Sequence, residues 1–145
     1  MKVAIVASKF NQDISNNLIK GALAKLKKNN FSSKNVTIYE VPGAFEIPFF
    51  ISKLLDASNR FDAIIAFGSV IKGETAHFEY IAKTVTDNIM KLSIENKSKT
   101  PILYGILTCY NHEQALERSL IKYKDKGGEV MQATIDLIKS FRELN

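Results

Sequence analysis

The sequence has 145 residues, of which 46% are hydrophobic and 24% are charged, with one cysteine, Cys109, and a formal net charge of +5. This length predicts one domain, residues 1–145, that folds without cross-links, and the single cysteine excludes a disulfide within the chain. No apolar run approaches a membrane span and no nucleic-acid motif accompanies the scattered lysines, so we expect no membrane and no nucleic-acid partner. Cysteine usage and the polar residues soon after the amino terminus indicate a cytoplasmic protein.

Hydrophobic patterning predicts strands that alternate with helices along the whole chain. In chain order, the pattern predicts strand 3–7, helix 13–28, strand 36–41, helix 45–57, strand 62–70, helix 76–96, strand 102–107, helix 111–123 and helix 129–144, with Gly127 and Gly128 separating the last two helices. Such alternation is typical of a parallel sheet covered on both faces. We therefore predict an α/β fold, a flavodoxin-like three-layer α/β/α sandwich whose four-stranded parallel sheet has the order 2-1-3-4.

The segments richest in chemical groups follow the predicted strands. These segments are residues 8–11 (SKFN), 42–46 (PGAFE), 68–77 (GSVIKGETAH) and 108–112 (TCYNH). The carboxyl ends of parallel strands meet at one edge of a sheet, and ligands of such folds bind beyond that edge. Aromatic rings, amides, carboxylates and both histidines of the chain are therefore expected to gather there, which is the composition of a binding site.

The turn and helix start around residues 73–77 suggest phosphate binding and proton transfer. Gly73 opens a predicted helix, whose first backbone N–H groups lack internal partners and can hold a phosphate. His77 falls in the first turn, at the positive end of the helix dipole, and a neutral imidazole there is the form that a general base needs. The alternative is that Glu74 and Thr75 only cap the helix and that His77 packs against neighbouring residues.

Three segments resemble the signature motifs of the lumazine synthase family. They are residues 41–48 (VPGAFEIP), residues 68–80 (GSVIKGETAHFEY), and residues 105–108 (GILT) followed by 113–118 (EQALER). Lys126 and Gly127 match the end of the loop before the family's last helix. Because the motifs are collinear over nearly the whole chain, the resemblance is far more specific than one short motif.

The resemblance implies a transferase of riboflavin biosynthesis. Enzymes of this family condense 5-amino-6-(D-ribitylamino)uracil with 3,4-dihydroxy-2-butanone 4-phosphate to 6,7-dimethyl-8-ribityllumazine, and release phosphate and water. The reacting amine belongs to the substrate, so the resemblance implies no lysine Schiff base, no metal and no redox cofactor. Much of the catalysis should then come from the positioning of two reactants.

The resemblance assigns the residues after the first two strands to the pyrimidine substrate. Phe10 matches the aromatic residue that stacks on the pyrimidine, and Asn11 matches the adjacent ring contact. Ala44, Phe45 and Glu46 match the loop that holds the ring and the ribityl chain, with Glu46 accepting hydrogen bonds from ribityl hydroxyls. The alternatives are that Phe10 and Phe45 are core aromatics and that Glu46 is a solvated carboxylate in a first helical turn.

The segment after the third strand matches the phosphate-binding and proton-transfer part of the family's site. Gly73, Glu74 and Thr75 match the phosphate-binding helix start, and His77 matches the proton-transfer residue. Since Glu74 is a carboxylate, the phosphate contact there would have to come from backbone N–H groups. The other histidine, His112, is expected to be a surface residue at a helix start.

The resemblance also implies that part of each site comes from a neighbouring subunit. Two residues match positions that the neighbour contributes: Tyr104 stands where the family usually has a phenylalanine, and Arg118 matches a phosphate-binding arginine. Two further matches lie near the pyrimidine: Val70 and Ile71 match a backbone stretch near the ring, and Lys126 matches a pocket lysine. The alternative for Arg118 is a surface residue that pairs with a polar side chain of its own helix.

Several positions depart from the family pattern. Tyr104 adds a hydroxyl to the aromatic wall, and Cys109 with Tyr110 replaces a threonine followed by an acidic residue.

The sequence begins at the first predicted strand, without the segment that adds a strand to a neighbour's sheet in icosahedral members, and residues 119–125 (SLIKYKD) differ from the capsid loop. We therefore expect a homopentamer rather than a sixty-subunit shell, with active sites between adjacent subunits.

Three other functions are compatible with parts of this pattern. An archaeal-type riboflavin synthase is the nearest enzyme, and a non-catalytic lumazine- or flavin-binding protein would keep the aromatic residues without needing His77 or Arg118. A flavodoxin-like signalling domain would not need the PGAFE loop. His77 and the intact residues 73–78 (GETAHF) favour a lumazine synthase over the riboflavin synthase, and the presence of both His77 and Arg118 disfavours the binding protein.

Overall fold

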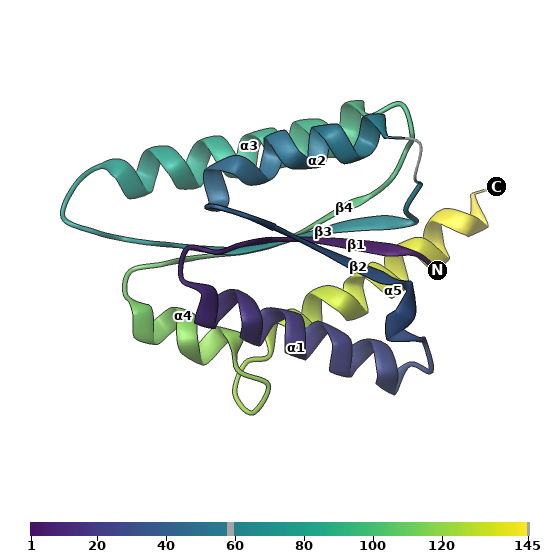
Figure 1. Cartoon of the computed structure of the whole chain (residues 1–145), viewed down its shortest axis with the longest axis horizontal. Helices are drawn as coiled ribbons and strands as arrows, with labels where there is room; N and C mark the ends of the chain where they lie inside the picture. Colours follow the sequence, from purple (N-terminus) through teal and green to yellow (C-terminus); the bar gives the residue numbers. More distant parts are fainter. Residues whose placement is uncertain (58–59, 145) are drawn as a thin grey trace.

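A parallel β-sheet lies between two layers of helices in the computed structural model, which describes residues 1–57 and 60–144 (Figure 1). In chain order the elements are β1 (Val3–Ser8), α1 (Gln12–Lys28), β2 (Val36–Val41), α2 (Ile47–Asp56), β3 (Ala63–Ile71), α3 (His77–Glu95), β4 (Ile102–Cys109), α4 (His112–Ser119) and α5 (Lys126–Glu143). Short 3-10 helices, Ser33–Asn35 and Ala44–Glu46, precede β2 and α2. In Figure 1, α2 and α3 cover one face of the sheet, while α1, α4 and α5 cover the other.

The four strands have the order β2-β1-β3-β4, which confirms the prediction. β1 pairs in parallel with both β2 and β3, so that Val3 lies opposite Val36 on one side and Ala63 on the other. β3 pairs in parallel with β4, with Ile64 opposite Ile102. β2 and β4 are therefore the edge strands of the sheet that the structure describes.

Each face of the sheet buries its own hydrophobic core, because successive side chains of a strand point to opposite faces. Val3 and Ile5 of β1 join one cluster together with Phe67 of β3, on the side of α1 and α5. Ala4 and Val6 join the other cluster, on the side of α2 and α3. Every residue of β1 is buried. The loops of the candidate site follow the carboxyl ends of these strands, so the buried sheet fixes where the loops begin.

The structure corrects the predicted boundary between the last two helices. α4 ends at Ser119 instead of continuing to residue 123, and α5 begins at Lys126 instead of residue 129. Gly127 and Gly128 therefore lie in the first turn of α5 and do not separate two helices. A Cβ atom on Gly127 would lie 2.0 Å from the backbone oxygen of Leu18 in α1. The sequence pattern of a helix break thus reflects the close packing of two helices.

The other element boundaries differ from the prediction by smaller shifts. The predicted helix 45–57 consists of the 3-10 helix Ala44–Glu46 and of α2, with Pro48 in the first turn of α2, where its missing N–H costs little. β4 runs beyond the predicted residue 107 to Cys109, because its last residues still pair with the end of β3. In the part of the chain that the structure describes, no helix has the length and apolar character to cross a membrane.

Candidate functional site

The loops that follow β1, β2 and β3 surround one hollow at the carboxyl edge of the sheet, which we call the aromatic hollow. It has a volume of about 470 Å³ and is lined by Phe10, Gly43, Ala44, Phe45, Glu46, Ser69, Val70, Ile71, His77 and Ile81. Most of the residues predicted from the first three strand ends are therefore brought together. Parallel pairing explains this, because it places the ends of β1, β2 and β3 side by side.

The two phenylalanines of the aromatic hollow are not core residues. Phe10 is 71% exposed and Phe45 is 60% exposed. Two backbone hydrogen bonds tie their loops together: Lys9 N–H donates to the oxygen of Val41 (2.8 Å), and Phe10 N–H donates to the oxygen of Pro42 (3.0 Å). The structure thus holds two large apolar rings in polar loops beside a cavity, as expected for rings that contact a ligand.

The carboxylate of Glu46 lies over its own loop. Glu46 N–H donates to the oxygen of Gly43 (3.2 Å), and a Cβ atom on Gly43 would lie 3.1 Å from Glu46 Oε2. Ala44, between them, is buried, and Glu46 is half-buried. A half-buried carboxylate that lines a cavity is a stronger acceptor for ligand hydroxyls than a fully solvated one.

His77 lines the aromatic hollow as the first residue of α3. α3 begins at His77, so Gly73 does not open the helix as the sequence predicted. Gly73, Glu74 and Thr75 form an exposed turn before the helix and do not line the aromatic hollow. Thr75 Oγ1 accepts a hydrogen bond from His77 N–H (3.3 Å), and Tyr80 N–H donates to the oxygen of Ala76 (3.3 Å). The N–H groups of Phe78 and Glu79, between them, have no backbone partner among the described residues.

Ser69 lines the aromatic hollow, although it is not among the site residues predicted from the sequence. Its side chain is 3% exposed, and its Oγ has no hydrogen-bond partner among residues 1–57 and 60–144. An unpaired buried hydroxyl costs about 1–3 kcal/mol, so its retention beside a cavity favours a polar contact with a ligand. The sequence contains one indication of this role: Ser69 interrupts the apolar run of β3 near the carboxyl end of the strand.

Asn11 lies outside the aromatic hollow. Its backbone is left-handed, with φ 55° and ψ 54°, and it caps the start of α1. Its backbone oxygen accepts hydrogen bonds from the N–H groups of Ile14 (3.0 Å) and Ser15 (3.3 Å). Asparagine tolerates the left-handed conformation better than most residues do, so this turn by itself accounts for Asn11.

A second hollow borders the edge strand β4 and the start of α5, and we call it the basic hollow. It has a volume of about 420 Å³ and is lined by Tyr104, Ile106, Leu107, Thr108, Cys109, Arg118, Lys124, Lys126 and Glu129. Lys126 Nζ lies 2.9 Å from Glu129 Oε1. Three cations therefore face one carboxylate, and that carboxylate is already paired. This charge balance suits a phosphate-bearing ligand.

Arg118 keeps donors available for a ligand in the basic hollow. Its Nη1 donates to the backbone oxygen of Gln114 (3.1 Å), and no carboxylate in the described part of the chain forms an ion pair with it. Of the two alternative partners on its own helix, Glu117 and Gln114, Arg118 bonds only the backbone of Gln114 among these residues and forms no ion pair with Glu117. A guanidinium group with free N–H groups can bind a phosphate through two parallel hydrogen bonds.

Burial keeps two titratable groups of the basic hollow protonated. Burial raises the pKa of the Cys109 thiol, and the positive charge of Arg118 acts in the opposite direction. Burial also raises the pKa of the Tyr104 hydroxyl, against the effect of a hydrogen bond with Thr86. Cys109 is therefore a thiol at neutral pH and not a thiolate nucleophile.

His112 lies at the surface, as predicted. It is the exposed first residue of α4, and its Nε2 lies 3.0 Å from Asp13 Oδ2. Nearby, Lys72 Nζ lies 5.8 Å from the centre of the Tyr110 ring and 3.7 Å from Glu79 Oε1. Within the described ranges, no three residues among His, Cys, Asp and Glu lie close enough together to hold a metal ion.

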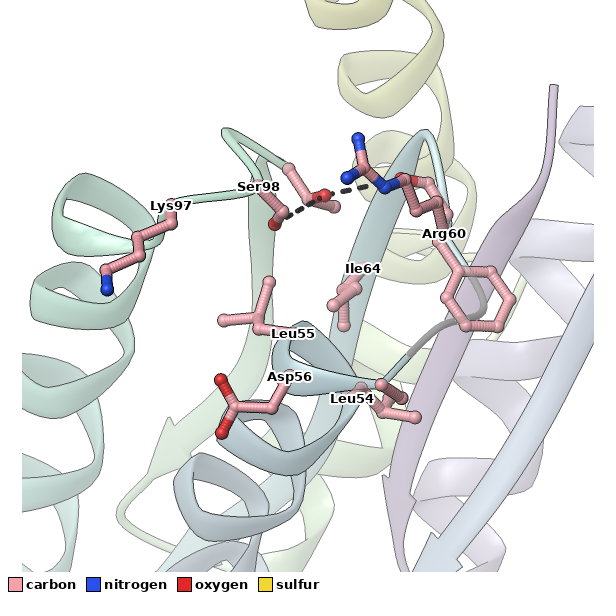
Figure 2. Close-up of a pocket in the computed structure, with 10 residues that line it drawn as sticks. Leu54, Leu55, Asp56, Arg60, Ile64, Lys97 and Ser98 are labelled. Carbon is pink, nitrogen blue, oxygen red and sulfur yellow. Dashed lines mark hydrogen bonds between the residues drawn. The ribbon is translucent and has the colours of Figure 1, made fainter.

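A third hollow, of about 460 Å³, lies at the amino end of β3, away from the predicted site residues. Figure 2 shows Asp56 and Arg60 among the residues that line it. Ser98 Oγ donates to Thr100 Oγ1 (3.0 Å), and Thr100 Oγ1 donates to the backbone oxygen of Phe61 (3.4 Å). The buried hydroxyl of Thr100 thus has a partner within the chain, and among the described residues that line this hollow no buried hydroxyl is left unpaired as that of Ser69 is.

The matches with known proteins extend over the elements that form both the aromatic and the basic hollow. A sequence model of the 6,7-dimethyl-8-ribityllumazine synthase family matches residues 1–142. The chain is also 42% identical over 137 residues to the 6,7-dimethyl-8-ribityllumazine synthase of Protochlamydia amoebophila (strain UWE25), an alignment that covers 94% of this chain and 78% of that protein. The chain therefore belongs to the 6,7-dimethyl-8-ribityllumazine synthase family.

Proposed function

We propose that this chain binds 5-amino-6-(D-ribitylamino)uracil in its aromatic hollow, and that the basic hollow of a neighbouring copy completes the site for 3,4-dihydroxy-2-butanone 4-phosphate. As a lumazine synthase, the chain is a transferase of riboflavin biosynthesis that joins these two substrates. The product is 6,7-dimethyl-8-ribityllumazine, and phosphate and water are released.

One observation supports the shared site above all others: the predicted site residues are divided between two separate hollows of the same chain. The aromatic hollow has the rings, Glu46 and His77, but no lysine or arginine of residues 1–57 and 60–144 lines it. The basic hollow has Tyr104, Arg118 and Lys126, beside an edge strand that has a free side. Each hollow therefore offers what the other lacks. In a homo-oligomer, the aromatic hollow of one copy would lie against the basic hollow of its neighbour, and we propose that this oligomer is a pentamer.

The pyrimidine half of the proposed site uses apolar rings and hydrogen-bond acceptors. Phe10 and Phe45 would contact the faces of the ring, and Glu46 would accept hydrogen bonds from ribityl hydroxyls. Ser69 Oγ, which has no partner among the described residues, would bond a polar atom of the ring. The backbone at Val70 and Ile71 lines the same cavity and would contact the ring edge.

The phosphate half of the proposed site uses positive charge and backbone N–H groups. The guanidinium group of Arg118 from the neighbour would hold the phosphate, together with N–H groups of the turn formed by Gly73, Glu74 and Thr75. The substrate amine attacks the ketone carbon, and His77 would carry the proton from that nitrogen toward the oxygen that leaves as water. Arg118 would stabilise the negative charge that develops as phosphate leaves.

The first test is turnover by the purified protein with both substrates, followed by lumazine absorbance and released phosphate. We expect the wild type to form product above the spontaneous rate. His77→Ala should lower kcat by about 10²-fold or more, the usual range for loss of a proton-transfer group. Arg118→Ala should raise KM for the sugar phosphate much more than KM for the pyrimidine.

A mixing experiment tests whether two copies share each site. His77→Ala and Arg118→Ala oligomers are unfolded together in equal amounts and refolded, alongside each variant alone. If the halves come from different copies, about a quarter of the sites receive two intact halves, and activity returns to about a quarter of the wild type. If one chain carries the whole site, no site regains both groups, and the mixture stays as inactive as the separate variants.

A further inference from the structure

A chain of two hydrogen bonds links the edge strand β4 to helix α3. Tyr104 Oη lies 2.9 Å from Thr86 Oγ1, and Thr86 Oγ1 donates to the backbone oxygen of Ala82 (2.7 Å). A threonine hydroxyl has one hydrogen, and a backbone oxygen can only accept. Because Thr86 uses its hydrogen for Ala82, Tyr104 must be the donor to Thr86. The direction of both hydrogen bonds is therefore determined.

Tyr104 is placed between the protein core and the basic hollow. Its ring packs against the core cluster under α2 and α3, and it also lines the basic hollow. Burial raises the pKa of its hydroxyl, so the group stays protonated and can donate to Thr86 throughout the ordinary pH range. The ring is thus held at both ends, by β4 at its Cα and by α3 at its hydroxyl.

We propose that Thr86 is a positioning residue that fixes the Tyr104 ring for the pyrimidine substrate. This inference rests on the proposed shared site and extends it: Tyr104 of the basic hollow stands where the family usually has a phenylalanine from the neighbour, so its ring would also form a wall of the neighbour's pyrimidine site. The bond to Thr86 holds the ring in one orientation before the substrate arrives, which removes the loss of side-chain freedom that binding would otherwise cause. It also leaves the phenol oxygen only as an acceptor, so it can bond a substrate N–H and cannot bond a carbonyl.

Calorimetric titration with the pyrimidine substrate alone tests this inference, because binding is measured without turnover. We expect Thr86→Val to raise Kd about threefold to tenfold, the range for ordering one side chain again on binding. Thr86→Ser keeps a hydroxyl and should restore wild-type affinity. In a Tyr104→Phe background, Thr86→Val should have no further effect, since the hydroxyl that Thr86 holds is gone.

A matched control is Thr84→Val, the same change on the same helix. Thr84 Oγ1 lies 3.3 Å from Asn88 Nδ2 and has no contact with Tyr104 among the hydrogen bonds of α3. This variant should keep the wild-type Kd. Oligomer size and thermal unfolding of all variants are compared, so that a change in assembly is recognised.

Two results would overturn the inference. One is an unchanged Kd in Thr86→Val, and the other is an equal rise in Kd whether residue 104 is Tyr or Phe, which would place the effect in α3 alone. If the wild type binds the pyrimidine but forms no product, only the proposed function is contradicted. The coupling of Thr86 with Tyr104 is measured from the Kd of the pyrimidine and does not require turnover.

Discussion

A Cβ atom on Gly127 would lie 2.0 Å from the backbone oxygen of Leu18, so α5 and α1 are packed backbone to backbone at this point. The contact lies in the first turn of α5, next to Lys126 of the basic hollow. The position of Lys126 therefore depends on its neighbour Gly127, which is buried against α1 and does not line the basic hollow.

Gly127→Ala should destabilise the protein although alanine is the better helix former. Helix propensity by itself would favour alanine by about 1 kcal/mol. The added methyl group meets backbone atoms that cannot rotate away, which places the cost at or above the upper end of the usual range of about 1–3 kcal/mol for overpacking. We expect a net loss of about 2 kcal/mol or more in the free energy of unfolding, measured by urea denaturation at a fixed protein concentration.

Gly73→Ala is the control for this prediction. A Cβ atom at Gly73 would meet nothing within 4 Å, and its φ is not positive. The free energy of unfolding should stay within about 0.5 kcal/mol of the wild type, as for most surface changes. If Gly127→Ala were equally harmless, the close approach of α1 and α5 would not be a constraint on this fold.

Ser69→Ala should separate stability from binding. The Ser69 hydroxyl is buried without a partner in the described chain, so its removal should raise the free energy of unfolding by about 1 kcal/mol. The same change should weaken binding of the pyrimidine substrate, because the proposed hydrogen bond is lost. Urea denaturation and calorimetric titration measure the two effects.

Ser15→Ala serves as the matched control for Ser69→Ala. Ser15 is also buried, but its Oγ lies 3.4 Å from Ser8 Oγ, so this hydroxyl has a partner. Its removal should lower stability or leave it unchanged, with no effect on pyrimidine affinity. A loss of stability in Ser69→Ala would mean that Ser69 has a structural role.

Arg118→Ala should raise the pKa of the Cys109 thiol further. Burial already raises this pKa, and the positive charge of Arg118 lowers it. Loss of the charge should move the midpoint of thiol reactivity to higher pH, since only the thiolate reacts. The pH dependence of the reaction with a disulfide reagent measures the midpoint without any substrate. Lys122→Ala, which removes a charge outside the basic hollow, should leave the midpoint unchanged.

Stability should fall in alkaline solution through Tyr104 and Cys109. Burial raises both folded-state pKa values above the ordinary values of 10.0 and 9.0. The unfolded chain therefore loses these protons first as pH rises, and the free energy of unfolding declines from about pH 9 upward. Tyr104→Phe should show a smaller decline above about pH 10, the ordinary pKa of tyrosine, in urea denaturation. Tyr80→Phe, which removes an exposed hydroxyl, should decline like the wild type.

The sequence predicted the fold class because local periodicity records which segments are strands and which are helices, and the flavodoxin-like arrangement of that alternation supplied the strand order. Apolar runs such as residues 62–70 mark buried strands, and amphipathic spacing such as that of Ile14, Leu18 and Ala22 marks a covered helix face. Parallel pairing then placed the strand ends at one edge. The motif residues Phe10, Phe45 and His77 could therefore be assigned to one site before the structure was known.

Only the tertiary structure decided which groups share a cavity and which are buried without a partner. It separated Tyr104, Arg118 and Lys126 from the aromatic hollow, left Asn11 to cap α1, and showed the unpaired hydroxyl of Ser69. It also placed Gly127 inside a helix. The reason is physical: periodicity records which face of an element is buried, whereas the distance between side chains from different elements is set only when those elements pack.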